Sequence, residues 1–259
     1  MTALRSLLFN ALFYAVLVAL MILGLPALLF GRQGVFFMAR LWASTSIWLL
    51  ARLCGLHVEY RGLENIPQGG YIIASKHQSF LESLALLKYA PDFSYILKRE
   101  LVFIPVFGLY LLAGRQIAID RGSGRGALAS MIRKARVVIA DKRQIFIYPE
   151  GTRRAPGAPP QYKFGVAALY EATAAPILPV AINTGLYWGR RGFLRRPGTA
   201  IIEYLPAIAP GLAREQAASL LENQVEGACA RLNAEAVAAN PALAIVLAQG
   251  LESKDANPQ

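Results

Sequence analysis

The sequence predicts an α/β domain, in which helices flank a sheet, preceded by an N-terminal pair of membrane-associated helices. Two observations lead to this fold class. Residues 7–30 contain no charged side chain, and from residue 57 onward short β-like runs alternate with helix-length segments. This alternation is typical of an α/β sheet covered by helices. We therefore expect two parts, 1–56 with the membrane helices and 57–259 with a globular domain, in a chain of 259 residues that can bury an ample apolar core.

The N-terminal segment 7–30 is long enough to span a bilayer. It lacks the short apolar core and small-residue cleavage site of a signal peptide, so we expect it to be retained. The next apolar stretch, 35–56, differs because Arg40, Ser44 and Arg52 recur at multiples of four. Such a narrow polar stripe indicates a helix in the membrane interface. A buried core helix remains the alternative, because periodicity does not say whether lipid or protein covers an apolar face.

The rest of the chain contains seven short β-like runs, with helix-length segments between most of them. The runs are HVEYRG, YIIAS, FSYILK, RQIAID, QIFIYP, AAPILPVAIN and TAIIEYLP. The clearest helical segments are 80–90, 101–113, 123–141 and 162–174. A proline-free segment rich in Ala, Leu, Glu and Arg, 212–239, predicts a long closing helix near the C-terminus.

The charge balance is strongly basic, because 27 Lys and Arg against 16 Asp and Glu give a net charge of +11. Arginines concentrate in 121–143 and in GRRGFLRRPG, 189–198. Such a balance suggests an anionic partner: nucleic acid, anionic lipid headgroups or phosphorylated metabolites. The apolar N-terminus favours lipid, so we expect a membrane lipid partner and no nucleic acid. Solvated surface charge is the alternative for about half of the arginines. Cys54 and Cys229 match no metal-ligand spacing, and we expect no metal.

His77 is the first candidate catalytic residue. It directly follows the run YIIAS, so its imidazole should project from the carboxyl end of a strand, where open α/β sheets bind ligands. A histidine there can act as general base for a hydroxyl if a second group holds its other ring nitrogen, and Glu82 can be that group. Alternatively, Ser79 and Glu82 form a capping box that starts a helix. The sequence leaves both interpretations of Glu82 open.

A second motif, IFIYPEGTRR at 145–154, makes the chemistry specific. Together with HQSFLE, 77–82, it resembles the signatures H-x-x-x-x-D and F-P-E-G-T-R of the glycerolipid acyltransferase family, typified by lysophosphatidic acid acyltransferase. GRQIAIDR, 114–121, and ILPVAIN, 177–183, resemble two further blocks of that family in the same order. The resemblance therefore covers about 57–205, and the four blocks together are a strong signal.

The resemblance implies a mixed sheet flanked by helices and an O-acyltransferase that makes phosphatidic acid from lysophosphatidic acid. His77 would deprotonate the acceptor hydroxyl, which attacks the thioester of acyl-CoA or acyl carrier protein. This donor is a co-substrate that is already activated, so no cofactor is expected. The implied substrate-binding residues are Arg121, Glu150, Gly151, Thr152, Arg153 and Lys163. Arg121 and Arg153 would hold the acceptor phosphate, because a planar guanidinium suits a pair of phosphate oxygens.

Alternatives remain for two of these cations. Arg121 can instead form an ion pair with Asp120 or Glu150, and Lys163 can simply occupy an exposed face. The sequence also departs from the signatures at two positions. Tyr148 replaces a phenylalanine and retains the ring, whereas Glu82 replaces an aspartate with a longer side chain.

The replacement of aspartate by Glu82 weakens the assignment of the substrate more than the assignment of the reaction. Acylation of another lyso-lipid, such as lyso-ornithine lipid, stays open because the arginines would hold any acidic headgroup. A noncatalytic lipid-binding membrane protein is an alternative of a different class. We expect the protein at a bacterial inner membrane, with its catalytic domain on the cytoplasmic side.

Overall fold

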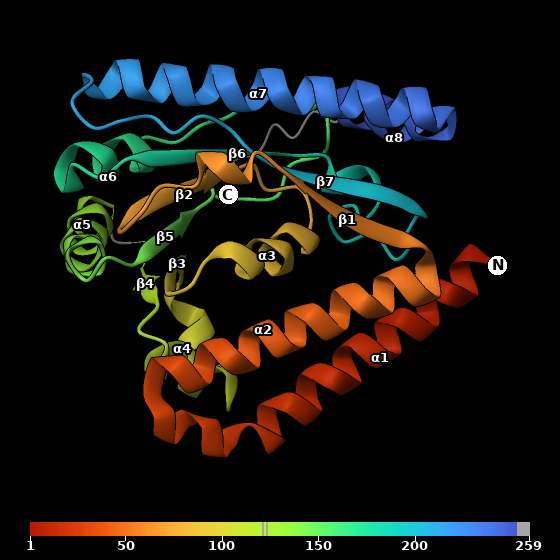
Figure 1. Ribbon diagram of the computed structural model, residues 1–259, viewed down its shortest axis with the longest axis horizontal. Coiled ribbons are helices and arrows are strands. Elements are labelled where there is room, and N and C mark those ends of the chain that lie inside the picture. The colour runs from red at the N-terminus through yellow and green to blue at the C-terminus, as the bar shows by residue number, and fades with distance from the viewer. Residues whose placement is uncertain (121, 123, 253–259) are drawn as a thin grey trace.

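The computed structural model describes residues 1–120, 122 and 124–252. Its centre is a seven-stranded sheet with the order β1-β7-β6-β2-β5-β3-β4 (Figure 1). The strands are β1 (Leu56–Arg61), β2 (Tyr71–Ser75), β3 (Phe93–Lys98), β4 (Ile117–Ile119), β5 (Gln144–Ile147), β6 (Ile177–Ile182) and β7 (Gly198–Tyr204). Neighbouring strands are parallel except β6 and β7, so β1 and β7 run opposite to the others. The predicted mixed sheet flanked by helices is confirmed.

Helices cover both faces of this sheet. They are α1 (Thr2–Leu23), α2 (Gly31–Leu49), α3 (Leu81–Ala85), α4 (Phe107–Ala113), α5 (Arg125–Ala140), α6 (Gly165–Thr173), α7 (Arg214–Ala239) and α8 (Ala244–Glu252). In Figure 1, α6 and α7 lie above the sheet, and α3 with the α1–α2 pair lies below it. Each face has its own apolar core: Tyr71 and Ile73 belong to the core with α1, α2 and α3, and Ile72 and Ala74 to the core with α5, α6 and α7. Every residue of β2 is buried, as expected for a parallel strand covered on both sides.

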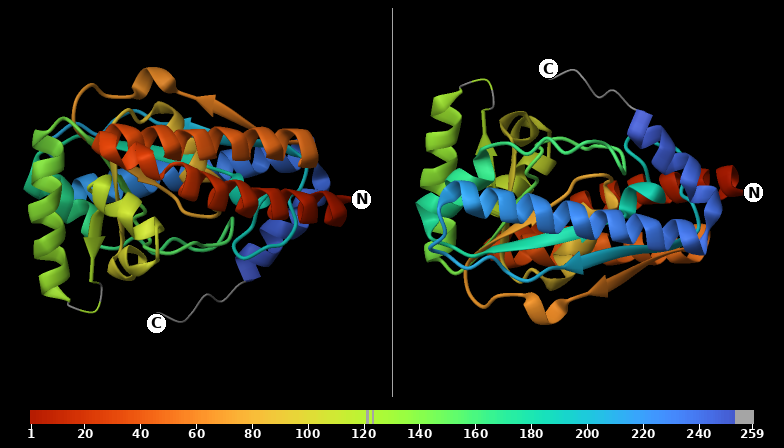
Figure 2. Two further views of the ribbon diagram at one scale, coloured as in Figure 1. Left: turned by 90° about the horizontal axis from the view of Figure 1, so that it is seen from below. Right: turned by 90° about the horizontal axis from the view of Figure 1, so that it is seen from above.

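The two N-terminal helices form a hairpin and lie side by side in the view from below (Figure 2, left). Both are long and apolar enough to cross a membrane. One side of the hairpin packs into the core through Phe9, Phe13 and Phe36. The opposite side leaves large apolar side chains exposed, including Leu29 and Phe30 at the turn between the helices. The inner side of the second helix is therefore packed against protein, as the alternative of a buried core helix predicted. Its location in the membrane interface stays a prediction. The domain boundary after residue 56 stays a prediction as well.

One helical segment differs from the sequence-based expectation because of a proline. The segment predicted as one helix, 101–113, is a short helical turn at Arg99–Phe103 followed by α4, since Pro105 lacks a backbone N–H and restricts the residue before it. The closing helix predicted for 212–239 is observed as α7 and ends where expected, at Ala239, two residues before Pro241. The helix α8, which follows that proline, was not predicted.

Candidate active site

The candidate site lies at the carboxyl edge of three adjacent strands. His77 follows β2, the segment 148–154 follows β5, and Thr184 follows β6. The Arg154 N–H donates a hydrogen bond to the His77 carbonyl oxygen (2.8 Å), which joins the first two segments directly. The parallel register of β2 with both neighbours thus brings three motifs together at the edge where open α/β sheets bind ligands.

His77 and Glu82 form a hydrogen-bonded pair. The Nδ1 atom of His77 lies 2.7 Å from Oε1 of Glu82, whose side chain is fully buried. The other carboxylate oxygen, Oε2, accepts a hydrogen bond from the Thr184 hydroxyl (2.7 Å). Because an ionised carboxylate can only accept, His77 donates through Nδ1 and Nε2 is left as the basic nitrogen. The imidazole therefore has the tautomer that a general base needs.

Glu82 also makes one half of a capping box, just before the short helix α3. Its Oε1 accepts hydrogen bonds from the backbone N–H groups of Gln78 (3.0 Å) and Ser79 (2.8 Å). The contact with Ser79 is the one that a capping box predicts. One oxygen thus makes both the cap and the histidine contact, so the two interpretations of Glu82 are compatible in geometry. Its contribution to catalysis stays a prediction.

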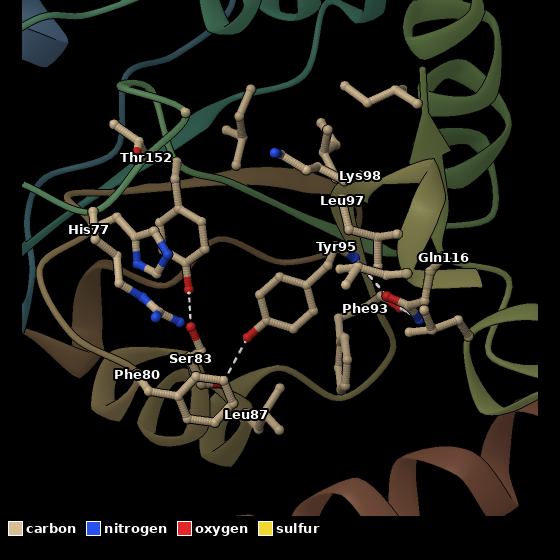
Figure 3. A pocket seen from close by; sticks show the side chains of 18 of the residues that line it. His77, Phe80, Ser83, Leu87, Phe93, Tyr95, Leu97, Lys98, Gln116 and Thr152 are labelled. Carbon is tan, nitrogen blue, oxygen red and sulfur yellow. Dashed lines mark hydrogen bonds between the residues drawn. The ribbon is translucent and has the colours of Figure 1, made fainter. Parts of the chain in front are cut away.

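Tyr148 forms an aromatic wall beside the imidazole. The two ring centroids are 3.8 Å apart and the ring planes differ by 12°. The Tyr148 hydroxyl shares a hydrogen bond with the Ser83 hydroxyl (2.8 Å), and the Tyr95 hydroxyl donates to the Ser83 carbonyl oxygen (2.8 Å). Burial raises the pKa of Tyr148 and of Tyr95 above the usual range, so both remain neutral near pH 7. Figure 3 shows His77, Ser83 and Tyr95 along one part of the cavity wall.

A cavity of ≈ 940 Å³ lies beside His77. Much of its lining is apolar and comes from α1, α2, α3 and α4, for example Leu20, Met38, Leu84 and Leu111. Cationic side chains line it as well: Lys98, Arg153, Lys163, Arg190 and Arg191. Among the described lining residues none is acidic. This lining suits a ligand that has both an apolar chain and an anionic group.

Four of the six predicted substrate-binding residues line this cavity: Gly151, Thr152, Arg153 and Lys163. Gly151 has a φ of +69°, which residues with a side chain rarely adopt, and a Cβ there would lie 3.5 Å from Nζ of Lys163. The guanidinium carbon of Arg153 lies 5.3 Å from the ring centroid of Phe80. Its Nε is buried, and no hydrogen-bond partner for it is found within the described part of the chain. Lys163 is exposed and lines the cavity at the same time. Arg121 lies outside the described residues.

Glu150, which was predicted to bind substrate, is not among the described residues that line the cavity, and its role in substrate binding stays a prediction. Its side chain is buried, with Oε1 3.5 Å from Nζ of Lys76 and 3.4 Å from Nε of Arg154. The same Lys76 ammonium lies 2.6 Å from Oε1 of Glu226 in α7. Burial raises the pKa of Glu150, and the charge of Lys76 opposes that rise. The chain turns at Gly151, so that the carboxylate points toward the protein interior while the residues after it face the cavity.

Several residues of the site were not identified from the sequence. Thr184 directly follows the block ILPVAIN, and Lys76 directly precedes the motif histidine, so adjacency to a motif was the available signal for both. Arg190 and Arg191 belong to the basic stretch 189–198. Its charge indicated an anionic partner, but the sequence assigned these two residues no specific role.

His77, held through Nδ1 beside a cavity with apolar and cationic lining, suits an enzyme that acylates a lipid hydroxyl. The sequence model of the acyltransferase family matches residues 57–183. A 1-acyl-sn-glycerol-3-phosphate acyltransferase of Pseudomonas aeruginosa is 37% identical over 172 residues, which are 66% of this chain and 67% of that protein. The chain belongs to the glycerolipid acyltransferase family, as its motifs predicted.

Further similarities support the fold and the family. A chloroplastic 1-acyl-sn-glycerol-3-phosphate acyltransferase of Brassica napus is 28% identical over 200 residues, which are 74% of this chain and 56% of that protein. The chain thus spans little more than half the length of this plant relative. The crystal structure of the 1-acyl-sn-glycerophosphate (LPA) acyltransferase PlsC from Thermotoga maritima has the same fold, with a TM-score of 0.74 at 23% identity, over 90% of this chain and 98% of that chain.

Proposed function

We propose that the protein transfers an acyl chain from a thioester donor to the free hydroxyl of lysophosphatidic acid, giving phosphatidic acid in phospholipid synthesis. The observation that supports this most is the 2.7 Å contact between Nδ1 of His77 and the buried Glu82 carboxylate, at the wall of a cavity with apolar and cationic lining. The names of the relatives support the choice of acceptor.

The chemistry proceeds through His77. The acceptor hydroxyl donates a hydrogen bond to Nε2, and the imidazole takes the proton as the oxygen attacks the thioester carbonyl. The Glu82 carboxylate stabilises the imidazolium that forms. As the tetrahedral intermediate collapses, the new C–O bond is kept, the C–S bond breaks, and the imidazolium returns its proton to the leaving thiolate. The donor, acyl-CoA or acyl carrier protein, is a co-substrate that supplies an activated acyl group, so the mechanism requires no further cofactor or metal.

Arg153 and Lys163 bind the acceptor phosphate in this mechanism. Both line the cavity, and Arg153 has a buried Nε for which the described residues provide no hydrogen-bond partner. A phosphomonoester oxygen is a strong acceptor for such a guanidinium. The apolar lining from α1 to α4 takes the acyl chain.

The proposed place of action is a bacterial inner membrane, with the catalytic domain on the cytoplasmic side. The open apolar side of the α1–α2 hairpin supports membrane association. Leu17 of α1 and Met38 of α2 also line the cavity, so a lipid acceptor in the bilayer is close to the site. Deleting residues 1–56 should move the protein into the soluble or aggregated fraction. Recovery of the intact protein in the soluble fraction after carbonate-free fractionation would contradict membrane association.

The acceptor is tested with purified full-length protein, one acyl-CoA and a panel of lyso-lipids. The panel contains lysophosphatidic acid, lysophosphatidylglycerol and lyso-ornithine lipid. Free thiol release gives the rate, and mass spectrometry identifies the acylated product. We expect the highest kcat/KM with lysophosphatidic acid. A higher value with lyso-ornithine lipid would replace the acceptor but keep the reaction, whereas no acceptor-dependent thiol release at all would indicate a noncatalytic lipid-binding protein.

A further inference from the structure

The loop after Trp188 provides two cavity cations that belong to none of the family signatures in this sequence. Arg190 and Arg191 are exposed, and both line the cavity that His77 also lines. They lie in the loop 189–197, which connects β6 and its short following helix to β7. The question is what holds this loop at the cavity and which substrate it meets there.

A buried arginine fastens the loop to α1. Arg195 is only 6% exposed, and its Nη1 donates to the carbonyl oxygens of Gly192 (2.8 Å) and Phe193 (3.0 Å) in the same loop. Its Nη2 donates to Oδ1 of Asn10 (2.6 Å), and its backbone N–H donates to the hydroxyl of Ser6 (2.9 Å). Asn10 and Ser6 are therefore the polar side chains by which a mostly apolar helix holds a cationic loop. We call Arg195, Asn10 and Ser6 the loop latch.

Aromatic contacts connect the latched loop with the catalytic centre. The guanidinium of Arg195 lies 4.1 Å from the ring centroid of Trp188, the residue that precedes the loop. Trp188 in turn lies against Phe80 (6.2 Å between centroids), and Arg153 lies over the ring of Phe80. Phe80 also lines the cavity close to His77, as Figure 3 shows. Arg190 and Arg153 thus reach the cavity from two segments that meet at the same aromatic side chains.

We propose that Arg190 and Arg191 complete the binding site for the phosphomonoester of the acceptor, and that the loop latch positions them. This inference rests on the proposed function. A phosphomonoester has a charge between −1 and −2 near neutral pH and offers three oxygens that each accept more than one hydrogen bond, so Arg153 and Lys163 leave acceptor capacity for further cations. The acceptor is favoured over the donor because the loop is fastened to α1, the helix with the open apolar side, and its own Phe193 and Leu194 are exposed there. A lipid acceptor arrives from that side, whereas a soluble thioester arrives from water.

The first test compares the acceptor KM of variants that lose arginines at different positions of the same loop. Arg190→Ala/Arg191→Ala should raise the KM for lysophosphatidic acid by about tenfold or more, because hydrogen bonds to charged groups contribute more than neutral ones. The KM for acyl-CoA should change by less than about twofold, because the donor does not touch these groups. Arg196→Ala is the control, since Arg196 belongs to the same loop, is half-buried and does not line the cavity. The wild-type preference for lysophosphatidic acid over lysophosphatidylglycerol, a phosphodiester, should fall in the double variant only.

The second test addresses the latch. Asn10→Leu removes the acceptor of the Arg195 guanidinium and should also raise the KM for lysophosphatidic acid, with kcat nearly unchanged. Combined with Arg190→Ala/Arg191→Ala it should add little, because the latch acts only through the two cations. Equal effects of Asn10→Leu in the presence and absence of these arginines would show that it disturbs the fold and not the loop.

Binding of lysophosphatidic acid to each protein, measured by titration calorimetry in detergent, separates this inference from the proposed function. If the wild type binds or acylates lysophosphatidic acid and the double variant does so equally well, the inference is overturned and the function stands. A raised KM for acyl-CoA with an unchanged acceptor KM also overturns it, by assigning the loop to the donor. If the wild type neither binds nor acylates lysophosphatidic acid, the proposed function fails and the inference fails with it.

Discussion

The His77–Glu82 pair and the cations of the cavity differ in how their polar atoms are satisfied. Glu82 is fully buried, and both of its oxygens accept hydrogen bonds from the protein. Arg153 is only partly buried, and the described residues provide no partner for its Nε. A satisfied pair is positioned before substrate arrives, whereas a cation that faces the cavity keeps its hydrogen-bonding capacity for a ligand. Changes to the pair should therefore lower kcat, and changes to the cations should raise the acceptor KM.

The largest effect is expected at the pair. Glu82→Gln should lower kcat by on the order of a hundredfold or more, because the neutral amide no longer stabilises the imidazolium and can favour the wrong tautomer. His77→Ala should lose at least as much. The free energy of unfolding of Glu82→Gln should change little, because an amide oxygen can still accept from the Ser79 N–H.

Two comparisons sharpen this prediction. Glu82→Asp restores the usual family residue and should keep substantial activity, unless the surroundings of α3 require the longer side chain. Near-normal turnover of Glu82→Gln beside an inactive His77→Ala would contradict the catalytic role of Glu82 and leave only its role as a helix cap.

The next effect is on the free energy of unfolding and concerns the buried ion pairs that Lys76 forms with Glu150 and Glu226. Lys76→Met removes the ammonium that lies between Glu150 and Glu226. Loss of one partner from such a buried cluster should lower the free energy of unfolding by about 3 kcal/mol. Urea denaturation measures it, and Lys76→Met/Glu150→Gln should recover part of the loss. If the single variant is as stable as the wild type, the buried cluster does not support the site.

The same cluster predicts the direction of a pH effect. Burial raises the folded-state pKa of Glu150 above its ordinary value of 4.5, so ionisation of this carboxyl opposes folding. The unfolded chain releases the proton first, and this contribution to stability therefore declines as the pH rises above 4.5. The destabilisation of Lys76→Met should accordingly be larger at about pH 7 than at about pH 5.

A smaller effect, on binding, is expected at the cations. Arg153→Ala should raise the acceptor KM about tenfold and leave the donor KM little changed, because its guanidinium binds a group that is present in both ground and transition states. Arg153→Lys should recover only part of the affinity, since an ammonium cannot bind two oxygens in one plane. Lost donor affinity with an unchanged acceptor KM would instead assign Arg153 to the thioester.

The smallest effect is expected at Tyr148. Tyr148→Phe keeps the ring that stacks on the imidazole and removes the hydroxyl that shares a hydrogen bond with the Ser83 hydroxyl. We expect kcat to fall by less than about fivefold, because one neutral hydrogen bond contributes about 1 kcal/mol. A loss as large as that of Glu82→Gln would show that the hydroxyl itself acts on substrate or on His77.

Much of the fold and the centre of the site could be predicted because their signals are local. The alternation of short β-like and helical runs predicted the flanked sheet, and the run YIIAS placed His77 at the end of a strand. The spacing from His77 to Glu82 allowed both a cap and a histidine contact, and the structure contains both. The break at Pro105 was visible in the sequence as well, but the apolar residues on both sides suggested one continuous helix.

The sequence by itself determined the family, the flanked sheet and the position of His77, the proposed base, because contiguous motifs and local periodicity encode them. Only the tertiary structure decided which remote residues meet that base. Thr184 binds Glu82 from more than a hundred positions away, and Glu150 turns inward to Lys76 although its motif suggested a substrate contact. Arg190 and Arg191 line the cavity, and Arg195 of the same loop is hydrogen-bonded to Asn10 of α1. Such contacts depend on strand order, register and helix packing, which the local preferences of the chain do not specify.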